Sequence, residues 1–140
     1  MNDEAAHDLT KPQDDFATRV TELAASAWPH FTSIRTNGDH ELMIVYLDLF
    51  DDKLIRAARR IGPPQGESDS TLTAVAGLAA LRRAIAIEKL AREHCAAGGM
   101  DDIETARKHA ADNYDAGKDW SDETLASYWS TLPTPGPDVS

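Results

Sequence analysis

The stretch Thr71-Leu-Thr-Ala-Val-Ala-Gly-Leu-Ala-Ala-Leu81 decides the fold of this 140-residue chain, because it carries no charged side chain over about three helical turns. A helix that is apolar around its whole circumference must be covered by other elements on every side. Ser68 or Ser70 can cap its start, and Gly98-Gly99 can end it. The pattern therefore predicts one long helix over residues 70–97, buried at the centre of the domain.

Helical periodicity continues on both sides of this segment. Phe16, Val20 and Leu23 recur at helical spacing and predict a first helix over residues 15–27, which Trp28-Pro29 ends. A second helix is expected over residues 39–61 and ends at Gly62-Pro63-Pro64. Another is expected over residues 101–116, where the first acidic residues can cap it, and a short one over residues 121–132.

Residues 31–47 admit a second interpretation. The turn signal Thr36-Asn37-Gly38-Asp39 lies between two partly apolar segments, which is typical of a β-hairpin. Against a hairpin, apolar residues fall on one arc of a helix over residues 39–61 and charged residues on the opposite arc. The apolar arc consists of Met43, Tyr46, Leu47, Phe50, Leu54, Ala57, Ala58 and Ile61.

We therefore expect an all-α domain of four to five helices, packed like a bundle around residues 70–97. An α+β fold with a hairpin at 31–47 is the alternative. Residues 1–13 are polar and acidic and residues 133–140 are rich in proline, so disordered tails are expected on either side of a single helical domain at 14–132. The best-buried residues of the central helix are expected to be Leu72, Val75, Leu78, Ala79, Leu81, Ile85 and Leu90.

The net charge of −10 bears on partners and location. Direct nucleic-acid binding is disfavoured, because contacts with phosphates supply most of that affinity. The first residues are acidic and lack an apolar segment, and the longest apolar run, Leu42–Leu47, is too short to span a bilayer. The single cysteine, Cys95, excludes an intramolecular disulfide. These features predict a cytoplasmic protein without a membrane segment.

No pattern in the sequence indicates catalysis or a cofactor. Signatures of phosphate-binding loops and nucleophile elbows are missing, and the histidines are scattered without the spacing of metal ligands. Asp112 and Glu123 match the first and twelfth positions of a calcium loop, but Tyr114 and Ala116 occupy positions that require oxygen ligands. We expect no enzymatic activity, no cofactor and no metal.

Segregated charge is the feature that points to a function. Bases recur on the helices before and after the loop at 62–70, and antiparallel packing would bring their arginines together as a ridge for an acidic partner. The competing interpretation is internal pairing with the acidic segments. Carboxylates after residue 100 could instead imitate the phosphates of DNA. The residues expected to contact a partner are Arg56, Arg60, Arg82, Arg83, Asp112, Asp115, Asp119 and Asp122.

These observations favour a non-catalytic regulator, adaptor or accessory subunit that binds another protein. Small residues on one helix face, Ala76, Ala80 and Ala84, suit helix-to-helix association. The alternative is an acidic phage or plasmid protein, either a DNA mimic that blocks a defence enzyme or a component of virion assembly. A homo-oligomer is compatible with each of these hypotheses.

Overall fold

The structure is a computed structural model that describes residues 2–64, 68–99, 102–116, 118, 125 and 127–132, with side chains from Asp15 onward. This part of the chain is all-α and contains no strand, so the helical prediction is confirmed and the hairpin alternative is wrong. The elements are α1 (Asn2–Thr36), α2 (His40–Ile61), α3 (Asp69–Ala96), α4 (Ile103–Asp115) and the 3₁₀ helix η1 (Tyr128–Thr131).

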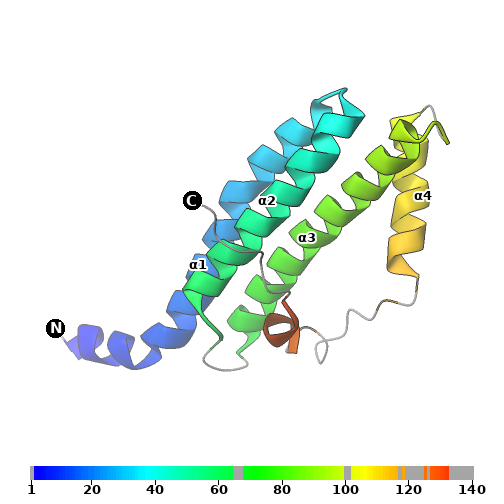
Figure 1. The fold of residues 1–140 in the computed structure, drawn as a ribbon. Helices are drawn as coiled ribbons and strands as arrows, with labels where there is room; N and C mark the ends of the chain where they lie inside the picture. Colours follow the sequence, from blue (N-terminus) through cyan, green and yellow to red (C-terminus); the bar gives the residue numbers. More distant parts are fainter. Residues whose placement is uncertain are drawn as a thin grey trace.

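The helix α3 is the centre of the fold. It packs against all the other described elements, with α1 and α2 on one side and α4 on the other (Figure 1). The first half of α3 buries most of its apolar side chains, but Thr73 and Ala80 are exposed, so the other described elements do not cover it on every side. The burial predicted for Val75, Leu78, Ala79, Leu81 and Ile85 is confirmed, whereas Leu72 and Leu90 are only partly buried.

Helix ends follow the capping residues of the sequence. Ser68 accepts a hydrogen bond from the backbone N–H of Thr71 and caps α3, and Asp102 caps α4 in the same way. Gly62 ends α2 with a φ of 90°, a left-handed value that glycine adopts at little cost. The predicted bounds of α2, α3 and α4 therefore agree with the structure to within about two residues.

The predicted end of the first helix at Trp28-Pro29 is wrong, because α1 continues to Thr36. Pro29 removes one backbone hydrogen bond from a helix interior. The helix nevertheless continues because Phe31 is buried and Ile34 partly buried in the core beyond it. The Asn37–Gly38 turn signal is real, but it joins two helices instead of two strands.

The backbone of residues 2–13 belongs to α1, where the sequence predicts a disordered tail. The described core contacts begin only at Phe16, and the expected domain boundary near residue 14 stays a prediction. The tail expected at 133–140 lies outside the described residues. Of the helix predicted at 121–132, the structure describes residue 125 and residues 127–132, which include η1.

The core has two parts. The larger one joins α1, α2 and α3, and η1 closes one end of it, where the ring centroids of Trp129 and Phe16 lie 4.9 Å apart. The smaller one consists of Ala91 on α3 with Ala106 and Ala110 on α4. Ile87, Leu90, Cys95 and Ile103 pack against these alanines and are only partly buried, so the fully buried apolar surface between α3 and α4 is small.

By length and composition alone, α3 could also cross a bilayer. The core helix of a folded domain has the same composition, and α3 is covered by three helices and buries the charged residues Glu88 and Arg92. Of its most apolar 18-residue window, 39% is buried inside the described structure, and the expected absence of a membrane segment stays a prediction.

Candidate protein-binding surfaces

The arginines expected to form a basic ridge are turned largely into internal pairs. Arg82 makes two hydrogen bonds to the carboxylate of Asp51 on α2, at 2.9 and 3.0 Å, and a third to the hydroxyl of Tyr128. Arg83 makes a similar double contact with Asp115 on α4. Bidentate arginine–carboxylate pairs fix both partners in orientation. Arg82 and Arg83 therefore join helices of this chain to one another.

The remaining predicted bases lie on α2. Arg56 pairs with Asp52 one turn earlier, at 2.8 Å, and Arg60 is exposed near the end of the helix. Arg56 and Arg60 therefore lie on one face of α2. Unlike Arg82 and Arg83, Arg56 pairs with an acid of its own helix.

The predicted acidic surface is only partly described. Asp112 is exposed on α4, whereas Asp115 is paired with Arg83, whose hydrogen bond lowers the pKa of Asp115 below its ordinary value. Asp119 and Asp122 lie outside the described residues.

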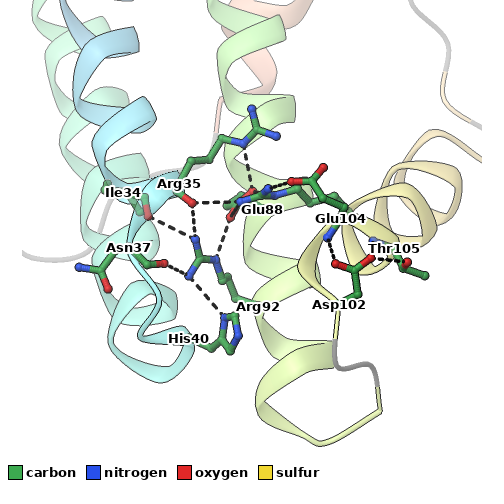
Figure 2. A network of polar contacts seen from close by, with 10 residues as sticks. Ile34, Arg35, Asn37, His40, Glu88, Arg92, Asp102, Glu104 and Thr105 are labelled. Atoms are coloured by element: carbon green, nitrogen blue, oxygen red, sulfur yellow. Dashed lines mark hydrogen bonds and ion pairs between the residues drawn. The ribbon is translucent and has the colours of Figure 1, made fainter.

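A buried ionic network centred on Glu88 was not predicted from the sequence. Glu88 is 2% exposed and accepts hydrogen bonds from Arg92 of the same helix and from Arg107 of α4, both at 2.8 Å, while Arg35 of α1 approaches to 3.4 Å (Figure 2). One carboxylate therefore connects three helices. A signal existed, because Glu88 and Arg92 are four residues apart on one helix, a spacing that suits an ion pair.

Arg92 has a second role at the end of α1. Its guanidinium, only 1% exposed, donates hydrogen bonds to the backbone carbonyls of Ile34, Arg35 and Asn37 (Figure 2). The carbonyl of Ile34 also accepts a hydrogen bond from the backbone N–H of Asn37, whereas those of Arg35 and Asn37 lie at the end of α1, where carbonyls lack helical partners. The positive charge also suits the negative end of the helix dipole.

The Glu88 network predicts a loss of stability in acid. Burial by itself raises the pKa of Glu88, but the hydrogen bonds from Arg107 and Arg92 outweigh burial, and the pKa is lowered from its ordinary value. The pKa of Glu88 is therefore lower in the folded state than in the unfolded state, where it is about 4.3. Above that pH the ionised carboxylate contributes its full stabilisation. As the pH falls through the pKa of the folded state, this stabilisation is lost. Urea unfolding between neutral pH and pH values near 3 should show this decrease.

The matched comparison for this prediction is Glu88→Gln against Glu22→Gln, which removes an exposed carboxylate. The slope of unfolding free energy against pH should flatten in Glu88→Gln and stay close to that of the natural chain in Glu22→Gln. Some slope will remain, since Asp115 and Asp102 also have lowered pKa values. Equal slopes in the two variants would contradict the assignment.

Next to this network, a groove of about 350 Å³ opens between α1, α3 and α4. The Glu88 network lies at one end of it. Its lining combines apolar side chains with charged ones: Trp28, Phe31, Ala84, Ile87 and Ala111 are apolar, and Arg35, Arg83, Glu88, Glu104, Arg107 and Lys108 are charged. Trp28 is 38% exposed although it packs edge-to-face against Phe31.

Charge in the groove is opposite to the charge of the whole chain. Four bases and two acids line it, in a protein whose net charge is −10. Glu88 pairs with Arg35 and Arg107, and Glu104 pairs with Arg107. Arg83 pairs with Asp115 just outside the lining, so four bases stand against three acids, and Lys108 is exposed at the rim. The groove therefore presents an apolar floor with excess positive charge at its edge.

A second surface lies on α2. Its outer face carries Leu42, Val45, Tyr46 and Leu49, which are 42–54% exposed and which we name the α2 stripe. Tyr46 belongs to the apolar arc of the sequence pattern, but it lies at the edge of that arc and its side chain is 47% exposed. The sequence pattern does not separate the stripe from the buried arc of α2, because both are apolar. The signal of the stripe was the i, i+3, i+4, i+7 spacing of large apolar residues.

Comparison of the chain with protein-family models, with curated proteins and with solved structures finds no match.

Proposed function

We propose that this protein is a non-catalytic protein-binding regulator, adaptor or accessory subunit of the cytoplasm. Its partner binds the groove between α1, α3 and α4 through an acidic, amphipathic segment. The observation that supports this proposal is the combination of an exposed tryptophan with excess positive charge in one groove of an otherwise acidic protein. Tryptophan and arginine are the residues that most often dominate binding energy at protein interfaces.

The lining indicates how such a segment would bind. A large apolar side chain of the partner fits against Trp28, Phe31 and Ile87, where contact with water is lost. Carboxylates on the same segment face Arg35 and Lys108 at the rim. The rest of the surface is negatively charged and repels an acidic segment, so the segment binds only in the groove.

Selection from a library of random peptides tests this proposal without knowledge of the natural partner. Peptides enriched on the purified full-length chain should combine acidic residues with a large apolar residue. Trp28→Ala and Lys108→Glu should each weaken binding of a selected peptide about tenfold or more, equivalent to about 1.4 kcal/mol, as measured by fluorescence anisotropy. Circular dichroism should show that both variants remain folded.

Arg19→Glu is the matched control, because it makes the same reversal of charge at an exposed position of α1, outside the groove. Equal loss of binding in Arg19→Glu and Lys108→Glu would contradict a groove-specific site, as would selected peptides without acids. A DNA mimic of phage or plasmid origin would instead lose its target on reversal of Asp112 to lysine and keep it in Lys108→Glu.

A further inference from the structure

The α2 stripe, defined above as Leu42, Val45, Tyr46 and Leu49, is separate from the groove. It contains four of the five large apolar side chains that are exposed among the described residues. Single exposed apolar residues are common, but several on adjacent turns of one helix form a continuous patch, and such patches mark interfaces. The order of residues along α2 bears on what could cover this patch.

We propose that a second copy of this chain covers the α2 stripe, with the two α2 helices antiparallel about a two-fold axis between residues 45 and 46. Leu42 then lies at the height of Leu49 of the partner subunit, since these residues are equally far from the axis. Val45 and Tyr46 flank the axis and meet their own equivalents. The stripe is therefore complementary to itself, as a two-fold interface requires.

Charged residues beyond the stripe favour the antiparallel arrangement. Asp39, whose Oδ1 caps α2 by accepting a hydrogen bond from the N–H of Leu42, and Lys53 are both exposed. On a helix of 3.6 residues per turn, both lie on the side that carries Tyr46. In the antiparallel pair, Asp39 and Lys53 of the partner subunit differ by about one residue in position along the helix axis. Two equivalent acid–base contacts would bracket the apolar centre.

A parallel pair would have the opposite electrostatics. Lys53, Arg56 and Arg60 continue along the same outer face of α2 toward its C-terminal end. A parallel arrangement would place each of these bases opposite its own equivalent, which is repulsive. In the antiparallel arrangement they extend beyond the start of the partner subunit's α2 and avoid one another.

Size-exclusion chromatography with light scattering tests the dimer on the full chain. The natural protein should have twice the mass of one chain at high concentration and dissociate on dilution. Val45→Glu and Leu49→Glu should each give a single chain at the same concentration, with an unchanged circular dichroism spectrum because both positions are exposed. Thr73→Glu, an equivalent change at an exposed position of α3, should remain dimeric.

Disulfide trapping tests the register independently. In a Cys95→Ala background, a mixture of Leu42→Cys and Leu49→Cys chains should oxidise to a disulfide-linked dimer. Each variant alone should form the linked dimer at least tenfold more slowly, because the like positions are separated along the helix. Equally fast linkage of Leu42→Cys alone would overturn the antiparallel arrangement. A natural chain that keeps the mass of one copy at every concentration would overturn the dimer and leave the stripe to a different partner.

Discussion

Replacing Glu88 with alanine should lower the free energy of unfolding by about 3–5 kcal/mol, measured by urea denaturation. Glu88 is the common acceptor for Arg92 and Arg107, and the guanidinium of Arg92 is almost fully buried. Without Glu88, this cation keeps its contacts with backbone carbonyls but has no opposite charge. The total stability of a domain is about 5–15 kcal/mol, so the loss is a large part of the margin.

Glu104→Ala is the control for this prediction. Glu104 also pairs with Arg107, but its side chain is 68% exposed. Exposed ion pairs contribute about 0–1 kcal/mol, so this variant should unfold close to the natural midpoint. Equal destabilisation by the two alanine substitutions would contradict the assigned role of burial. A chain with both Glu88→Leu and Arg92→Met should recover part of the loss, because apolar residues of similar volume can replace a buried ion pair.

Replacing Leu78 with aspartate should unfold the domain altogether. Leu78 is fully buried at the centre of α3, within the core shared by α1, α2 and α3. An unpaired carboxylate there loses its hydration and gains no partner, a cost of several kcal/mol in addition to the lost apolar burial. Circular dichroism should show loss of the helical signal and of a cooperative thermal transition.

Two further substitutions make the Leu78 result specific. Thr73→Asp places the same charge on an exposed face of α3 and should leave the transition nearly unchanged. Leu78→Ala creates a cavity without a charge and should cost about 2–5 kcal/mol while keeping the fold. A cooperative transition in Leu78→Asp close to that of the natural chain would contradict the central position of α3.

The fold could be predicted to the level of helix number and centre because its signals are local. The uncharged run at 71–81, the capping side chains and Gly62 each act within a few residues of their position. The helix end predicted at Pro29 was wrong because the loss of one backbone hydrogen bond there is outweighed by burial of Phe31 farther along the helix. Such compensation depends on packing against other helices, which periodicity on one helix does not reveal.

The candidate surfaces were less predictable for the same reason. Arg82 and Arg83 resemble a binding surface in the sequence, but their partners Asp51 and Asp115 are about thirty residues away along the chain. The groove combines α1, α3 and α4, so no single segment carries its pattern. The α2 stripe is local and could have been recognised, but the periodic pattern of α2 contains two apolar faces and does not say which of them is buried.

The alanine contact between α3 and α4 has a consequence for dynamics. Because α4 is the shortest α-helix among the described residues and the fully buried residues of its contact with α3 are alanines, we expect local unfolding to start there. Opening of α4 breaks the pair between Arg107 and Glu88 and removes one wall of the groove. If the proposed partner touches both α1 and α4, it should stabilise the closed form, so that part of the binding energy goes into ordering α4.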